Sequence, residues 1–429
     1  MNWFQHFIAW PLAVRLTLAS VIGVVLAAVV NWAAYSLAYE ATYRSPWSRK
    51  HPRDEFFSPS DRVPIFGWWR LRRLAPTLGR GFWIRPLLLE LSAAIIVPVW
   101  YSWETVHGGL LSPRPAEDVI AADFRINFVL HCQFFIHLVL GAFMLAASLI
   151  DADERNIPDA VTVPGTLVGL TLLTIIPVGM LPYFYDPNTK HIYPLLAAPT
   201  FAWPPGWLGP GAAGGLLLSL GCFWFWCWGL VFGGRLPPLR SNMVRLRRAL
   251  RVTLARVRLD PAVPWVVGGA IVGSIVIAMV WQFEAARREA LLTALIGLAG
   301  GAAIVWVVRI LGSWAFQKEA MGFGDVTLMA MIGAYLGWQP ALIVFFAAPI
   351  AALVICLPSW FFGTREMLPY GPYLCSAAAA VVIGWGPIWD WAAPRFEFAW
   401  LVPGVLVVGF FLIGCVLALL RGLRSASGG

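Results

Sequence analysis

Charged residues are scarce in this chain of 429 residues. Asp, Glu, Lys and Arg together make up 12% of it, whereas hydrophobic residues make up 59%. A water-soluble domain would carry about twice that charged fraction. The hydrophobic residues form long runs separated by loops rich in Arg and Pro, which favours membrane-spanning helices over a barrel. The composition therefore predicts a polytopic membrane protein.

Paired cysteines are also missing. Six cysteines are present, all within apolar runs, and none belongs to a CxxC pair. This pattern argues against a zinc site and against a disulfide framework. The first apolar run is long and lacks a small-residue cleavage site, so we expect no cleavable signal peptide. The net charge of +9 does not indicate nucleic-acid binding, because the arginines lie in short loops beside apolar runs and there set orientation.

Eleven apolar runs predict an all-α bundle of about 9–11 transmembrane helices. Many of the 24 Trp residues lie near the ends of these runs, as interfacial anchors do. The run at 325–338 is short for a full crossing. The runs cover residues 10–38, 85–103, 126–150, 160–182, 211–233, 263–283, 289–312, 325–338, 340–361, 371–388 and 400–421.

The distribution of Lys and Arg predicts the orientation. Loops 39–84 and 234–262 are Arg-rich and should be cytoplasmic, whereas loops 104–125 and 183–210 carry few basic residues and should be external. The N-terminus is then outside. Only the short turn containing Arg287 and Arg288 disagrees. Within the basic regions, residues 51–83 fit a segment lying on lipid and a substrate-docking loop equally well, and 241–259 has the pattern of an amphipathic surface helix.

This topology places two acidic clusters at the same depth on the cytoplasmic side. Asp325 follows Gly322-Phe323-Gly324 at the mouth of an apolar run, where an acid is costly. Asp151 lies in the second cluster, at the end of another run. Two carboxyl groups held close together can share a proton. The ionised one can then deprotonate water while the protonated one polarises a peptide carbonyl, which needs no metal, serine or cysteine.

Simpler interpretations exist for each of these residues. Asp325 is an equally good helix N-cap. Pro158 suits the first turn of a new helix. Gly322 and Gly324 would permit close backbone approach or a positive φ. The remaining charged residues of the two clusters fit caps, solvated turns or interfacial charges, and His131 and His137 fit hydrogen-bonded core positions better than metal ligands. Those charged residues are Asp153, Glu154, Arg155, Asp159, Lys318 and Glu319.

Several segments together resemble the bacterial prepilin peptidases, which are type IV leader peptidases and aspartic proteases of the inner membrane. GFGD, preceded by Lys318-Glu319 and followed by an apolar helix ending in LGW, resembles their GxGD motif. IDADERNIPDAVTVP resembles their other aspartate motif, and Pro158-Asp159 matches its non-catalytic Pro-Asp pair. LPYGPYL resembles a late motif, and DRVPIFGWWRLRR followed by RPLLLELS resembles their cytoplasmic loop and second helix. The resemblance implies that Asp151 and Asp325 are catalytic.

The chain departs from the family in two ways. Residues 39–84 contain no cysteine, although many family members carry two CxxC pairs there, associated with zinc. The resemblance therefore supports neither zinc nor the S-adenosylmethionine of N-methylation, and we expect no cofactor. The two aspartates are 174 positions apart (151 to 325), a longer gap than is usual in the family, which suggests an inserted helix pair at about 211–283.

These observations divide the chain into six regions. They are a first transmembrane helix (1–38), a basic cytoplasmic loop without the family's cysteines (39–84), helices carrying the first aspartate (85–182), an inserted external loop, helix pair and basic loop (183–288), helices carrying GxGD (289–390), and an added C-terminal helix and tail (391–429).

The implied function is an intramembrane endopeptidase that removes the leader of type IV prepilins or type II secretion pseudopilins at the cytoplasmic face of the inner membrane. By resemblance, the helices surround a cleft that faces the cytoplasm. Two alternatives remain: a transporter whose acids couple protons, which predicts acids near the midplane and broken helices, and a non-catalytic scaffold of a pilus or secretion system. The sequence does not identify the substrate or the oligomeric state.

Overall fold

The structure is a computed structural model of the whole chain. It describes residues 2–40, 45–47, 57–181, 183–189, 191–194, 209, 213–233, 255–316, 321–361, 369–396, 401, 404–412 and 414–415. The predicted amphipathic helix at 241–259 lies mostly outside the described residues. The predicted span at 400–421 is described only in part, and its residues 404–412 are helical.

The described chain is helical apart from one two-stranded antiparallel hairpin. The long helices are α2 (Leu12–Ser36), α5 (Ile84–Tyr101), α7 (Phe124–Glu154), α8 (Asp159–Ile175), α9 (Ala213–Phe232), α11 (Ala262–Val280), α12 (Ala285–Phe316), α13 (Phe323–Leu336), α14 (Trp338–Phe361) and α15 (Tyr370–Ile383). The short elements are α1 (Asn2–Ile8), η2 (Pro59–Arg62), α3 (Phe66–Leu71), η3 (Arg72–Leu74), α4 (Ala75–Leu78), η4 (Ser102–Val106), α6 (Glu117–Ala122), η5 (Pro177–Gly179), β1 (Tyr183–Asp186), β2 (His191–Pro194) and α16 (Trp385–Phe396).

The predicted all-α polytopic membrane class is confirmed. Among the described residues, seven helices are long and apolar enough to cross a membrane, and there are eight if α15 and α16, which meet at a bend of 90°, form one span. The predicted spans at 160–182 and 325–338 correspond to the shorter helices α8 and α13. The span expected at 371–388 is interrupted where α15 ends at Ile383.

Helix α13 is the centre of the bundle. Every residue from Gly324 to Leu336 is buried, and a helix that is apolar on all sides belongs in a core. Its neighbour α12 comes very close, because a Cβ at Gly297 would collide with the carbonyl oxygen of Gly333. On the α8 side, the hydroxyl of Thr162 donates to that of Thr327 at 3.0 Å. A helix of only 14 residues is thus enclosed rather than exposed to lipid.

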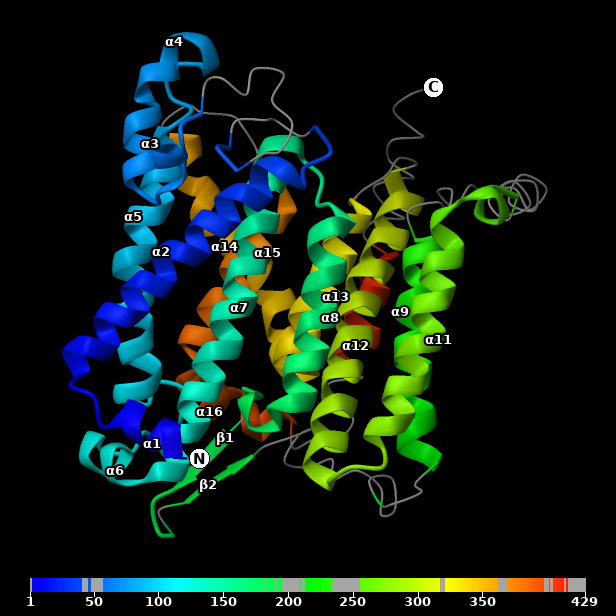
Figure 1. Cartoon of the computed structure of the whole chain (residues 1–429). Helices are drawn as coiled ribbons and strands as arrows, with labels where there is room; N and C mark the ends of the chain where they lie inside the picture. The colour runs from blue at the N-terminus through cyan, green and yellow to red at the C-terminus, as the bar shows by residue number, and fades with distance from the viewer. Residues whose placement is uncertain are drawn as a thin grey trace.

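The bundle has two distinct ends. Helices α3 and α4 lie at one end, and α1, α6 and the hairpin lie at the other, with α7 running between them (Figure 1). An ion pair joins the start of α5 to the end of α7: Arg85 Nη1 lies 2.6 Å from Asp153 Oδ1. The C-terminal end of α7, which carries Asp151, is therefore at the same end as the α3–α4 segment. Helices α9 and α11 lie beside α12 on one flank of the bundle (Figure 1).

Candidate active site

Asp151 lies in the last turn of α7 and is 4% exposed. The helix does not end at Asp151, as the sequence suggested, but continues to Glu154. It is closed by Arg155 in the left-handed conformation (φ 56°), whose N–H donates to the carbonyl of Asp151 at 2.8 Å. Pro158 was expected in the first turn of α8. It is instead the buried N-cap, one position before the first helical residue. This turn fixes the direction of the Asp151 backbone.

Asp325 lies in the first turn of α13 and is 7% exposed. The N-cap of this helix is Gly322, so the interpretation of Asp325 as the N-cap is wrong. Asp325 is instead the third helical residue, and its carboxylate reaches back to hydrogen-bond the backbone of Gly322. Asp325 is therefore held in the first turn of α13, but it does not occupy the N-cap position.

The two glycines of GFGD have different roles. Gly322 has a φ of −64°, so it does not need the left-handed region, and an added Cβ would meet only ordinary contacts, the nearest being Asp325 Oδ2 at 3.8 Å. A Cβ at Gly324 would lie 2.8 Å from Cβ and 2.9 Å from the carbonyl oxygen of Ile157. The close approach expected of these glycines is thus found at Gly324, where α13 contacts the turn between α7 and α8.

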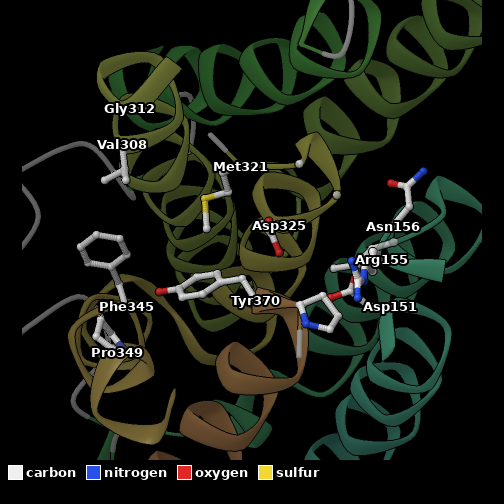
Figure 2. Close-up of a pocket in the computed structure, with 14 residues that line it drawn as sticks. Asp151, Arg155, Asn156, Val308, Gly312, Met321, Asp325, Phe345, Pro349 and Tyr370 are labelled. Atoms are coloured by element: carbon white, nitrogen blue, oxygen red, sulfur yellow. The ribbon is translucent and has the colours of Figure 1, made fainter. Parts of the chain in front are cut away.

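The two aspartates line one partly open cavity of about 610 Å³. In Figure 2 both carboxylates border this space, and the Tyr370 ring extends across it toward Phe345. The wall between the polar groups is mainly apolar and includes Met321. Residues far apart in the sequence therefore meet at one cavity through the end of α7 and the starts of α13 and α15.

Gly371 is a site residue whose role was not predicted from the sequence. Its N–H, in the first turn of α15, donates to Oδ2 of Asp151 at 3.0 Å. A Cβ at this position would lie 2.5 Å from that oxygen and 2.9 Å from Ile157 Cδ1. The segment LPYGPYL pointed to this region by resemblance, but no local pattern links it to Asp151.

Other predicted residues lie away from the cavity. Phe323 does not line it and packs beside Gly233 at the end of α9. Asp159 is exposed at the start of α8. Burial, together with the charges of Asp159 and Glu154, raises the pKa of Tyr39 above its usual range, so this neighbouring phenol stays neutral. Lys318 and Glu319 lie outside the described residues.

Asp153 and Glu154, which follow Asp151 in the same acidic cluster, make structural contacts. Asp153 pairs with Arg85, and the Glu154 carboxylate accepts the backbone N–H groups of Tyr39 and Glu40 at 2.9 and 2.8 Å. These contacts attach the end of α7 to the starts and ends of neighbouring helices, which agrees with the interpretation of both acids as non-catalytic.

The described residues contain no group of three or more His, Cys, Asp or Glu side chains placed to hold a metal ion. His131 is hydrogen-bonded to the Tyr101 hydroxyl at 2.8 Å and to the Asn127 carbonyl at 2.7 Å. His137 contacts the Glu104 carboxylate at 3.0 Å. Both histidines thus lie in hydrogen-bonded core positions, as the sequence suggested.

Comparison with known proteins identifies a family for the segment that carries Asp325. Residues 263–357, which include GFGD, match the model of the type IV leader peptidase family. This segment of the chain is similar to the type IV leader peptidases. The resemblance to prepilin peptidases predicted from the sequence is thereby confirmed. The match includes Asp325 and α11 but neither Asp151 nor α9.

The chain is similar over part of its length to bacterial proteins named as leader peptidases. The chain is 33% identical over 117 residues to a prepilin leader peptidase/N-methyltransferase of Aeromonas hydrophila, covering 24% of this chain and 37% of that protein. It is 39% identical over 102 residues to the leader peptidase HopD of Escherichia coli, covering 23% of this chain and 61% of that protein. The chain thus matches about a third of the length of the Aeromonas relative. No solved structure matches the chain.

Proposed function

We propose that this protein is an intramembrane aspartic endopeptidase that removes leader peptides from prepilins or pseudopilins. One observation carries the proposal: two aspartates 174 positions apart are both buried and line the same cavity. A buried carboxyl group is costly, and two on one cavity wall form the arrangement that aspartic proteolysis uses. The leader peptidase match of the segment around Asp325 supports the same reaction class.

The chemistry uses the two carboxyl groups in opposite protonation states. The ionised carboxylate takes a proton from a water molecule held between the pair, and the water oxygen attacks the carbonyl carbon of the leader peptide bond. The protonated carboxyl group donates its proton to the carbonyl oxygen as it becomes a hydroxyl. When the tetrahedral intermediate collapses, one hydroxyl proton returns to the carboxylate that had donated its proton. The C–N bond breaks, and the amine leaves with the proton that the other carboxyl group took from water.

The surroundings favour a peptide substrate at a membrane boundary. The cavity is at the end of the bundle that carries the Arg-rich α3–α4 segment, and we propose that this end faces the cytoplasm in the inner membrane, with the N-terminus outside. A basic leader would then meet the site from the cytoplasm while the apolar part of the substrate stays in the membrane. The acids lie at helix ends rather than near the middle of a span, which disfavours the transporter alternative.

The proposal does not extend to N-methylation. Residues 39–84 contain no cysteine, whereas the names of several relatives include N-methyltransferase. The mass of the processed product separates the two activities. A product that carries the added mass of a methyl group when S-adenosylmethionine is supplied would extend the function to methylation.

Substitution of each aspartate tests the peptidase. Asp151→Asn and Asp325→Asn should each abolish cleavage of a prepilin substrate in proteoliposomes, because one carboxyl group alone cannot perform both proton transfers. Asp159→Asn is the matched control, since Asp159 is exposed and does not line the cavity. Full cleavage by either Asn variant would refute the dyad. A wild-type protein that binds prepilin without cleaving it would favour the scaffold alternative.

A further inference from the structure

The end of α9 touches the segment that carries Asp325. A Cβ added to Gly233 would collide with the ring of Phe323, far inside van der Waals contact with three ring atoms. Any larger residue at this position would have to displace the Phe323 ring. Phe323 is the first residue of α13, so the contact lies two positions before the aspartate.

Arg309 of α12 joins the same two segments by hydrogen bonds. Its side chain is buried, with 7% of the residue exposed. Nη1 donates to the carbonyl oxygen of Gly233 at 2.8 Å, and Nε donates to that of Met321 at 3.0 Å. The guanidinium carbon also lies 5.7 Å from the centre of the Phe323 ring. The planar fork of an arginine can satisfy two carbonyls at fixed angles, which a lysine cannot do.

Helix α9 is itself held firmly in the bundle. The Phe225 ring lies 5.7 Å from the Trp306 ring of α12, and Trp224 Nε1 donates to the Ser274 hydroxyl of α11 at 3.0 Å. A fixed α9 can therefore restrain whatever its C-terminal end contacts. Since Met321 lines the cavity and Gly322 caps α13, this restraint acts at the start of the helix that presents Asp325.

We propose that α9 is a positioning element for the GFGD segment, with Gly233 and Arg309 as its positioning residues. The inference rests on the proposed peptidase function. Neither α9 nor Gly233 lies within the matched residues 263–357, so the family match gives them no role. Displacing the start of α13 by about 1 Å would misalign Asp325 with Asp151, and a misplacement of that size costs up to about 100-fold in rate.

The test compares kcat and KM for cleavage of a prepilin substrate by full-length protein in proteoliposomes. Gly233→Ala should lower kcat at least tenfold and leave KM within about twofold, because the added methyl group pushes Phe323 away. Combining it with Phe323→Leu, which removes the ring, should restore kcat to that of Phe323→Leu alone. Arg309→Lys should also lower kcat, although it keeps the positive charge, because a lysine cannot donate to both carbonyl oxygens at fixed angles.

Gly229→Ala is the control. It adds the same methyl group to α9 one turn before Gly233, where a Cβ meets nothing within 4 Å, so kcat should not change. Wild-type kcat in both Gly233→Ala and Arg309→Lys would overturn the proposal, as would a fall in kcat for Gly233→Ala that Phe323→Leu does not relieve.

A second measurement does not depend on cleavage. A cysteine placed at Met321 should react with a water-soluble maleimide several-fold faster when Gly233→Ala or Arg309→Lys is also present, after subtraction of labelling at the native cysteines. A wild-type protein that cleaves nothing while these labelling rates change would refute the peptidase and leave the restraint by α9 intact. Unchanged labelling together with active enzyme would refute the restraint alone.

Discussion

The N–H of Gly371 donates a hydrogen bond of 3.0 Å to Oδ2 of Asp151, a residue 220 positions earlier in the chain. The first N–H groups of a helix have no partner within it, and Gly371 lies in the first turn of α15. The carboxylate therefore satisfies a donor that α15 cannot satisfy itself. In return, α15 fixes one oxygen of Asp151 and leaves the other for the cavity.

Gly371→Ala should lower cleavage at least tenfold. The new methyl group would lie 2.5 Å from Asp151 Oδ2 and 2.9 Å from Ile157 Cδ1, so either the carboxylate or α15 has to move. The measurement is kcat for prepilin cleavage, normalised to the folded protein recovered from the membrane.

Gly221→Ala is the matched control for this substitution. A Cβ at Gly221, in α9, meets nothing within 4 Å, and alanine favours a helix more than glycine does. This variant should keep full activity. If Gly371→Ala cleaves as fast as Gly221→Ala, the contact with Asp151 has no part in the reaction.

Substitution by alanine should destabilise the protein at one glycine of GFGD and leave it unaffected at the other. Gly324→Ala places a methyl group against the backbone of Ile157, which cannot rotate away. Overpacking of this kind costs about 1–3 kcal/mol in stability, and it should also separate Asp325 from Asp151. Gly322→Ala meets nothing closer than 3.8 Å and should fold normally. Thermal unfolding in detergent, with cleavage assayed in parallel, distinguishes them; equal stability of the two variants would contradict the close packing at Gly324.

The membrane class, most helix positions and the two aspartates of the candidate site could be predicted from the sequence, because each is signalled locally. A run of apolar residues marks a span, and an acid beside such a run is costly enough to stand out. The role of Asp325 as an N-cap could not be excluded locally, because the cap of α13 depends on the backbone at Gly322.

Other features depend on contacts between distant segments. Gly371, Gly233 and Arg309 each contact a residue more than ten positions away in the chain, and no periodicity or motif reports such a pair. The close approach of Gly297 to Gly333, which encloses α13, is equally invisible in the sequence. These contacts depend on how the helices pack, so a single chain without relatives aligned to it gives no sign of them.

The ion pair between Arg85 and Asp153 should contribute little to stability and nothing to catalysis. Both side chains are about two-fifths exposed, at 40% and 46%, and exposed pairs contribute about 0–1 kcal/mol. Asp153→Asn should therefore unfold within a few degrees of the wild type and cleave at the wild-type rate. Loss of cleavage in a folded Asp153→Asn protein would move this acid into the catalytic machinery.

The buried polar cluster around Glu104 should be structural. Trp100 Nε1 donates to Glu104 Oε1 at 2.6 Å, and His137 Nδ1 lies 3.0 Å from the same oxygen. Glu104 and His137 are 0% and 1% exposed, so removing the acceptor leaves the buried His137 ring and the half-buried Trp100 N–H without this partner. Glu104→Ala should cost about 2–4 kcal/mol, whereas Glu104→Gln keeps an acceptor oxygen and should cost less.

Thermal unfolding of the two Glu104 variants in detergent provides the comparison, with cleavage measured per folded molecule. The difference between Ala and Gln reports the lost hydrogen bonds together with the cavity that the shorter Ala side chain leaves. Cleavage per folded molecule should stay at the wild-type level in both, since neither Glu104 nor His137 lines the cavity of Asp151 and Asp325. If Glu104→Gln folds as well as the wild type but fails to cleave, then the charge of this cluster acts on the reaction from a distance.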